Sequence, residues 1–373
     1  MDATKKLGFG LMRLPLADPS DFTAVDVEAF KKMVDVFMEA GFTYFDTAYG
    51  YHGGHSETAF REAVAKRYPR EAFTITDKMP VYDKPSKEGL SKIFNEQLER
   101  CGVDYFDYYW VHCVDSFIIK HTEEVDAFGF IQKMKEEGKV KHTGFSFHDT
   151  AECLDQILTR HPEVEYVQLQ LNYLDWEDGD VQARLCYETA VKHGKKVMVM
   201  EPVRGGDLAR LPQPAEEIIK AYDPAPSNAS WALRFAATLP EVEKVLSGMT
   251  EMSHVTDNVA VMGDFKPLSD DDKAMLARVA DFIHAGDRIA CTGCRYCIAG
   301  CPMEISIPDY FSLYNEAVLL NRRKRGEQQE QYKALGEQGG AVADCLSCGA
   351  CAERCPQHID IPRRLIDVKN ALE

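Results

Sequence analysis

The sequence predicts an α/β protein, a (β/α)8 TIM barrel followed by a small, mostly helical C-terminal domain. Short β-rich runs alternate with longer amphipathic runs through about the first 260 residues, which is typical of repeated βα units and a parallel sheet. Eight of the twelve cysteines then fall in the last quarter of the chain, which indicates a different organisation there. The pair Ala285 and Gly286 is a candidate hinge, so the expected domains are 1–286 and 287–373.

The predicted elements follow one another in the order that a barrel requires. The strand candidates are residues 6–10, 44–48, 74–78, 106–112, 142–147, 166–172, 196–202 and 244–249. Helical runs include residues 27–40, 87–101, 128–137, 151–158, 181–193 and 269–284. Right-handed crossovers of this number close into a barrel, whereas an open doubly wound sheet normally carries a glycine-rich phosphate loop, and no GxGxxG follows the first strand. The Pro- and Gly-rich segment 203–230 is expected to be a long loop over the barrel mouth.

The composition is that of a globular protein with a large core, at 45% hydrophobic and 28% charged residues. There is no run of about 18 apolar residues and no signal-peptide pattern at the start, so we expect a cytoplasmic protein without a membrane partner. The net charge of −17 repels polyanions and argues against nucleic acid as a partner. Nearly all of it belongs to residues 1–286, because residues 287–373 hold 11 basic and 12 acidic side chains.

The cysteines of the last quarter form two copies of one motif, CxxCxxCxxxCP. The first copy is Cys291, Cys294, Cys297 and Cys301 before Pro302, and the second is Cys345, Cys348, Cys351 and Cys355 before Pro356. This spacing binds [4Fe-4S] clusters, and the fourth cysteine ligates the other cluster in two-cluster ferredoxins. The expected ligand sets are therefore Cys291, Cys294 and Cys297 with Cys355, and Cys345, Cys348 and Cys351 with Cys301. Structural zinc, the alternative, normally uses two separated CxxC pairs.

The residues around these motifs resemble a ferredoxin with a helical insert. A helical pattern covers about residues 308–336 between the motifs, and the sequences IPDY and IPRR predict helices that start at Pro308 and Pro362. The basic run Arg322, Arg323, Lys324 and Arg325 is either a solvated helix face or a docking surface for an acidic electron carrier. Cys101, Cys113, Cys153 and Cys186 are scattered in apolar or helical contexts and are assigned no chemistry.

Polar residues end the second, third and fourth predicted strands, at the rim where barrel enzymes assemble their sites. These are Asp46, Lys78 and His112, and Tyr51 follows Asp46 in the segment FDTAYGYHGGHSE. Carbonyl reduction needs a proton donor at the oxygen, and Tyr51 is the natural acid if a cation such as Lys78 eases its proton loss. Asp46 would fix Lys78, and His112 can hydrogen-bond the substrate oxygen.

These motifs, together with ITDK, YYWVH, GFSF, QLQLN and MEPVRGG, resemble the aldo-keto reductase family over about residues 5–260. With the cysteine motifs, the chain resembles the iron-sulfur subfamily found mainly in anaerobes. The resemblance implies a catalytic tetrad of Asp46, Tyr51, Lys78 and His112. It also implies nicotinamide-cofactor contacts at Ser146, Gln168, Ser247, Gly248, Asp257 and Asn258.

The sequence departs from the family pattern at the expected cofactor positions. Phe147 replaces the usual asparagine and Met200 the usual stacking tyrosine, while Met249 or Thr250 and His254 replace the usual basic residues. Without these cations the pairing that favours a 2′-phosphate is lost, so NADH, NADPH and no nicotinamide all remain open, and flavin is not excluded.

The sequence therefore predicts an oxidoreductase that reduces a small carbonyl-type or related substrate at the barrel mouth and exchanges electrons through two [4Fe-4S] clusters. A ferredoxin or flavodoxin is the expected protein partner. Two alternatives stay open: a nicotinamide-independent, ferredoxin-linked reductase, and a redox-sensing or regulatory barrel with structural clusters. Substrate identity and the direction of electron flow are not predicted.

Overall fold

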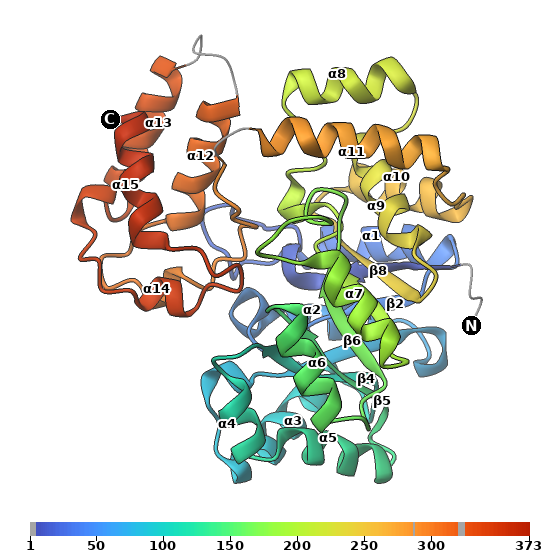
Figure 1. Ribbon diagram of the computed structural model, residues 1–373. Coiled ribbons are helices and arrows are strands. Elements are labelled where there is room, and N and C mark those ends of the chain that lie inside the picture. The colour runs from blue at the N-terminus through green and yellow to red at the C-terminus, as the bar shows by residue number, and fades with distance from the viewer. Residues whose placement is uncertain (1–4, 286–287, 320–324) are drawn as a thin grey trace. The chain divides into compact units, whose positions relative to one another are not determined.

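The computed structural model describes residues 5–285, 288–319 and 325–373 (Figure 1). The chain forms two compact units, one of Met1–Pro202 with Ala229–Ser269 and the other of Val203–Asn228 with Asp270–Glu373. The expected domain boundary, between residues 286 and 287, lies outside the described residues and stays a prediction.

The first unit contains a closed barrel of eight parallel strands in sequence order, in which β8 pairs with β1. The predicted fold class is thus confirmed, and each predicted strand is present. The strands are β1 (Leu7–Gly10), β2 (Tyr44–Asp46), β3 (Thr74–Met79), β4 (Phe106–Val114), β5 (Val140–Phe147), β6 (Tyr166–Gln170), β7 (Lys196–Met200) and β8 (Val242–Gly248).

Most helices of the first unit bury an apolar face, and three of them are capped by a short polar side chain. The α-helices are α1 (Val27–Glu39), α2 (His55–Phe60), α3 (Lys87–Cys101), α4 (Ile119–Glu124), α5 (Ala127–Glu136), α6 (Ala151–Arg160), α7 (Ala183–Lys192), α9 (Asn228–Thr238) and α10 (Met252–Gly263). Asp26, Ser86 and Thr150 accept a backbone N–H in the first turn of α1, α3 and α6. Short turns η1 (Leu11–Arg13), η2 (Tyr51–Gly54) and η5 (Val81–Asp83) follow β1, β2 and β3.

Bulky side chains fill the barrel interior on the N-terminal side of the polar strand ends. This cluster consists of Tyr44, Tyr108, Trp110, Tyr166, Met198 and Leu246. Gly144 makes room for it, because a Cβ atom there would lie 2.4 Å from the Tyr166 carbonyl oxygen and 2.8 Å from the Trp110 ring. The interior is therefore a packed core, and the chemistry is confined to the C-terminal mouth of the barrel.

The second unit is helical and corrects one prediction. Residues 203–230, expected to be a loop, contain α8 (Gln213–Tyr222), which packs against α11 (Asp270–His284). Pro214 lies in the first turn of α8, where the missing N–H costs no hydrogen bond, and Ala215 and Ile219 are buried. The prediction failed because the prolines of residues 203–230 were interpreted as loop residues, whereas Pro214 lies in the first turn of a helix.

The cysteine-rich part of the second unit is built from α12 (Ile307–Leu319), α13 (Arg325–Gln338), α14 (Ala350–Glu353) and α15 (Ile361–Leu372). The helices predicted at Pro308 and Pro362 begin one residue earlier, at Ile307 and Ile361. Their buried core includes Phe311, Leu365 and Val368. Arg322, Arg323 and Lys324 of the basic run lie outside the described residues. Over the part of the chain that is described, no helix is long and apolar enough to cross a membrane.

Candidate functional site

An ion pair between β2 and β3 forms the base of the barrel mouth. The ammonium of Lys78 donates to Asp46 Oδ1 at 2.6 Å and to the carbonyl oxygen of Thr47 at 2.6 Å. Both charged side chains are almost completely buried, at 1% and 4% exposure. The sequence-predicted pairing of Lys78 with Asp46 is thus present in the structure, and the ammonium is held in one place by two acceptors.

Tyr51 and His112 lie beside this pair. The Lys78 ammonium is 5.0 Å from the centre of the Tyr51 ring, and the ring centres of Tyr51 and His112 are 5.9 Å apart in an edge-to-face arrangement. Tyr82, from η5, also packs edge-to-face against His112, with the ring centres 5.3 Å apart. The structure therefore brings together all four residues of the predicted tetrad, from β2, η2, β3 and β4.

Burial decides the protonation of these groups. Desolvation, and then the carboxylate of Asp46, raise the pKa of Tyr51 well above its ordinary value. Desolvation, and then the Lys78 charge, lower the pKa of His112 well below 6.5. Tyr51 is thus a protonated phenol and His112 a neutral imidazole at physiological pH. Two uncharged hydrogen-bond donors next to an ammonium suit an oxygen that becomes negative during a reaction.

Two of the residues expected to contact a nicotinamide lie next to the tetrad, on β5 and β6. Ser146 and Gln168 are register neighbours. Gln168 donates from Nε2 to Asp46 Oδ2 at 3.3 Å, and its Oε1 atom is buried and has no hydrogen-bond partner in the described part of the chain. Ser146 Oγ already accepts from the backbone N–H of Cys113 at 2.8 Å. Gln168 thus keeps an acceptor atom without a partner among the described residues, whereas Ser146 Oγ already accepts one hydrogen bond from the backbone.

The remaining expected cofactor residues gather at the end of β8 and in α10. Asn258 donates to Ser247 Oγ at 2.9 Å, which ties α10 to the strand; Asp257 precedes Asn258, and Gly248 ends the strand. Residues 247–258 contain no lysine or arginine. His254 is exposed, and its Nδ1 atom accepts from the backbone N–H of Thr250 at 3.3 Å.

The substituted positions are accommodated in different ways. Phe147 and Met249 are packed in the interior, at 2% and 0% exposure, so neither presents a polar group to a ligand. Arg13, in η1, is a residue of this region that sequence reasoning missed. It pairs with Glu201 at 3.0 Å, and its charge acts to lower the pKa of Tyr51. Arg13 could have been found from its position directly after the first strand, because such loops lie at the mouth of a barrel.

The eight cysteines of the two motifs surround two separate pockets in the second unit. One pocket is lined by Cys291, Cys294, Cys297 and Cys355. The other is lined by Cys301, Cys345, Cys348 and Cys351. Each pocket thus takes three cysteines from one motif and the fourth from the other, the arrangement expected for two [4Fe-4S] clusters. Four thiols converging on one pocket fit a cubane cluster, which needs four thiolate ligands.

The loops that join the first three cysteines of each motif have positive φ angles at the same two positions. Gly293 and Arg295 in the first motif, and Ser347 and Gly349 in the second, all have positive φ angles. The N–H of Gly293 points to Cys291 Sγ at 3.4 Å. Such turns direct backbone N–H groups inward, where they stabilise anionic sulfur.

Comparison with known proteins gives two family matches along the chain. Residues 6–281 match the model described as aldo/keto reductase family, and residues 290–359 match the model described as 4Fe-4S dicluster domain.

Similar curated proteins cover most of the first match. They include the NADH-specific methylglyoxal reductase of Escherichia coli (strain K12), 24% identical over 66% of this chain and 87% of the relative. The L-galactose dehydrogenase of Arabidopsis thaliana is 25% identical over 72% of this chain and 88% of the relative.

Solved structures share the barrel. An aldo/keto reductase from Klebsiella pneumoniae in complex with NADP and acetate superposes with a TM-score of 0.59 at 20% identity, over 74% of this chain and 91% of that one. The holo form of an aldo-keto reductase from Bacillus halodurans gives 0.58 at 22% identity over the same shares of the two chains.

Proposed function

This chain belongs to the aldo/keto reductase family and carries a C-terminal 4Fe-4S dicluster domain, and on that premise we propose that it reduces a small carbonyl compound at the barrel mouth and exchanges electrons through two clusters. It is an oxidoreductase, as its family matches and structural neighbours indicate. The observation that carries the proposal is the buried Lys78–Asp46 pair beside Tyr51 and His112.

The four residues divide the work of protonating the carbonyl oxygen. His112, as a neutral donor, hydrogen-bonds and orients that oxygen. Tyr51 holds a proton that its buried environment keeps in place until negative charge develops on the substrate. The Lys78 ammonium then stabilises the phenolate left on Tyr51, and Asp46 keeps Lys78 in position.

A nicotinamide cofactor fits the residues next to the tetrad. Its carboxamide N–H would be held by Gln168 Oε1, a buried acceptor that has no partner among the residues that the structure describes. Ser146, Ser247, Gly248, Asp257 and Asn258 complete the proposed binding residues. When bound, a reduced nicotinamide supplies the hydride. The absence of lysine and arginine from residues 247–258 favours NADH over NADPH, since this segment offers no ammonium or guanidinium to pair with a 2′-phosphate.

The proposed cluster ligands are the two crossed sets that line the pockets. Cys291, Cys294, Cys297 and Cys355 would hold one cluster, and Cys345, Cys348, Cys351 and Cys301 the other. When bound, the clusters supply or accept single electrons, so a ferredoxin or flavodoxin is the partner that this chemistry calls for. A flavin would be the usual converter between hydride and single-electron transfer.

A second candidate is a ferredoxin-linked reductase that uses no nicotinamide. Two observations favour it: Ser146 Oγ already accepts the Cys113 N–H, and Phe147 places a buried ring where the family has an asparagine. In this version Tyr51 still supplies a proton, and the electrons reach the substrate singly.

The test is an anaerobic assay of the purified protein with NADH or NADPH and a panel of small aldehydes and dicarbonyls. The panel includes methylglyoxal, the substrate in the name of the Escherichia coli relative. Tyr51→Phe is expected to lower kcat by about a hundredfold or more. The matched control is Tyr105→Phe, which removes a hydroxyl next to the opposite end of β4. If Tyr51→Phe turned over every substrate at the wild-type rate, Tyr51 would not be the proton donor.

A further inference from the structure

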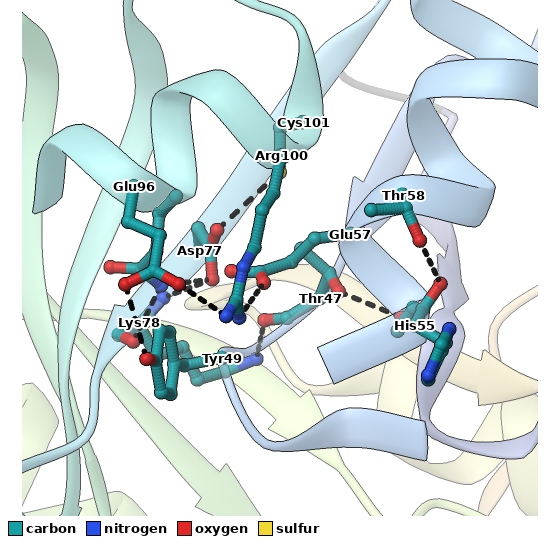
Figure 2. A network of polar contacts seen from close by, with 12 residues as sticks. Thr47, Tyr49, His55, Glu57, Thr58, Asp77, Lys78, Glu96, Arg100 and Cys101 are labelled. Atoms are coloured by element: carbon teal, nitrogen blue, oxygen red, sulfur yellow. Dashed lines mark hydrogen bonds and ion pairs between the residues drawn. The ribbon is translucent and has the colours of Figure 1, made fainter. Parts of the chain in front are cut away.

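Behind the proposed site, on the outer side of β3, lie two carboxyl groups that the mechanism does not use. Glu57 comes from α2 and Asp77 from β3, and both are 0% exposed. Their oxygens and the thiol of Cys101, at the end of α3, lie within 4.8 Å of one another. Figure 2 shows these side chains converging with Arg100.

The hydrogen-bond donors around this cluster leave one oxygen without a partner. Asp77 Oδ1 accepts from the Lys78 N–H at 2.8 Å and from Gln97 Nε2 at 2.7 Å. Asp77 Oδ2 accepts from the Cys101 thiol at 3.5 Å. Glu57 Oε2 accepts from Arg100 Nη1 at 3.1 Å, but Glu57 Oε1 is buried and has no donor among the described residues. A buried carboxylate oxygen of this kind is costly unless a proton is shared with it.

The charges of the two carboxyl groups and of Arg100 also indicate that a proton is held in this cluster. Among the described residues, the guanidinium that pairs with Glu57 is that of Arg100, which also pairs with Glu96. Two ionised carboxylates side by side in a dry interior repel each other, so one of them keeps its proton. Burial, followed by the charge of Asp77, raises the pKa of Glu57. The ionisable groups that interact with Glu57, with Asp77 or with Arg100 come from β3, α3, β4 and η5: Asp77, Lys78, Glu96, Arg100, Cys101, Tyr109 and Tyr82.

We propose that Glu57 and Asp77 share a single proton and that this carboxyl pair positions Lys78 from behind the barrel wall. The proton lies between Glu57 Oε1 and Asp77, which gives the orphaned oxygen a partner and leaves one negative charge for Arg100. A divalent cation in the same place would compete with the guanidinium for Glu57.

The link to Lys78 runs through its own peptide groups. Asp77 Oδ1 takes the N–H of Lys78, and Gln97 Nε2 bonds both Asp77 Oδ1 and the carbonyl oxygen of Lys78, the latter at 3.0 Å. The Tyr109 hydroxyl in turn donates to Gln97 Oε1. The backbone of the lysine is therefore held on the outer face of β3, while its ammonium points inward to Asp46. Asp77 and Gln97 are positioning residues, and this part of the inference rests on the proposed function.

The shared proton is tested without any assay of turnover. An infrared difference spectrum, wild type minus Glu57→Gln at neutral pH, should contain the carbonyl stretch of a protonated carboxyl group. The amide of the variant donates to Asp77 in place of the proton, so the fold is kept. As a control, the difference spectrum of wild type minus Glu136→Gln, a change on the exposed side of α5, should contain no such band. Absence of the band from the wild type, or a non-iron divalent metal lost in Glu57→Gln, overturns the proposal.

Thermal unfolding of the full chain gives a second readout. Because the pKa of Glu57 is raised on folding, its stabilising contribution is complete below about pH 4.5 and is lost as the pH rises. The thermal unfolding midpoint of the wild type, measured relative to that of Glu57→Gln, should therefore decrease as the pH is raised from 6 to 9. The expected decrease is roughly 2 °C per pH unit. A constant difference across this range contradicts a shared proton.

The positioning role is tested by two variants of Asp77. Asp77→Ala removes the acceptor for Lys78 and should lower kcat about tenfold or more with little change in KM. Asp77→Asn keeps that acceptor and donates to Glu57, so it should recover most of kcat. Equal kcat in a folded Asp77→Ala protein overturns the positioning role. If wild type has no carbonyl reductase activity, the proposed function fails while the infrared band still decides the shared proton.

Discussion

The ammonium of Lys78 lies 2.6 Å from Asp46 Oδ1 inside the barrel mouth, and both side chains are removed from solvent. Breaking a buried ion pair by removing one partner leaves an uncompensated charge, which costs about 3–5 kcal/mol. We therefore expect Lys78→Met to destabilise the barrel by that amount and to abolish carbonyl reduction. Denaturant unfolding and steady-state kinetics measure the two effects separately.

The double variant Lys78→Met with Asp46→Asn separates stability from catalysis. With both charges gone, no carboxylate is left unpaired, so much of the lost stability should return. Activity should stay absent, because Tyr51 then has no cation to stabilise its phenolate. Recovery of activity together with stability would show that the pair is structural only.

The low pKa of His112 predicts a stability that falls in acid. The folded protein holds His112 neutral, whereas the unfolded chain takes up a proton near pH 6.5. Stability from this residue is thus present above about pH 6.5 and is lost as the pH falls, at up to about 1.4 kcal/mol per pH unit. His112→Asn should lose this part of the pH dependence, while His254→Asn, at an exposed histidine, should keep it. Urea unfolding between pH 5 and 8 measures the slopes.

The crossed cluster ligation predicts which cysteine each cluster needs. A protein with Cys345, Cys348 and Cys351 all changed to serine should retain only the cluster of the other pocket, roughly four irons per chain. Adding Cys355→Ser to this background should then alter or remove the remaining cluster, whereas adding Cys301→Ser should leave it intact. Iron analysis and the electron paramagnetic resonance spectrum of the reduced protein distinguish these outcomes. The reverse dependence would mean that each motif supplies all four ligands of its own cluster.

The absence of lysine and arginine from residues 247–258 predicts that NADH is preferred over NADPH. His254→Arg, at the exposed start of α10, should lower the KM for NADPH roughly threefold or more, because a guanidinium can pair with the 2′-phosphate. The KM for NADH in the same variant is the control and should change little. Equal changes for both cofactors would place His254 away from the phosphate.

The barrel could be predicted from the sequence because its strands are short apolar runs, and three of them carry a polar residue at or near the C-terminal end. Asp46, Lys78 and His112 stand at those ends, so their convergence followed from the topology alone. The spacing of the cysteines predicted two crossed ligand sets, and the two pockets have that composition. Both predictions rest on patterns that are local in sequence.

Contacts made by packing could not be predicted in this way. Glu57 and Asp77 have the sequence appearance of surface charges, and only the packing of α2 against β3 and α3 places them together in the interior. The pairing of Arg13 with Glu201 joins the ends of β1 and β7, which are 188 residues apart in the chain. Helix α8 was missed because proline in a first turn and proline in a loop have the same sequence signature.

Electron exchange between a nicotinamide and the clusters can be followed by an anaerobic optical titration with NADH, then NADPH, then dithionite. We expect that a nicotinamide bleaches the broad cluster absorbance, that any flavin shows its own bands, and that a carbonyl substrate restores the colour in wild type but not in Tyr51→Phe. Clusters that stay oxidised under excess NADH and NADPH, and bleach with dithionite alone, would contradict electron exchange between a nicotinamide and the clusters.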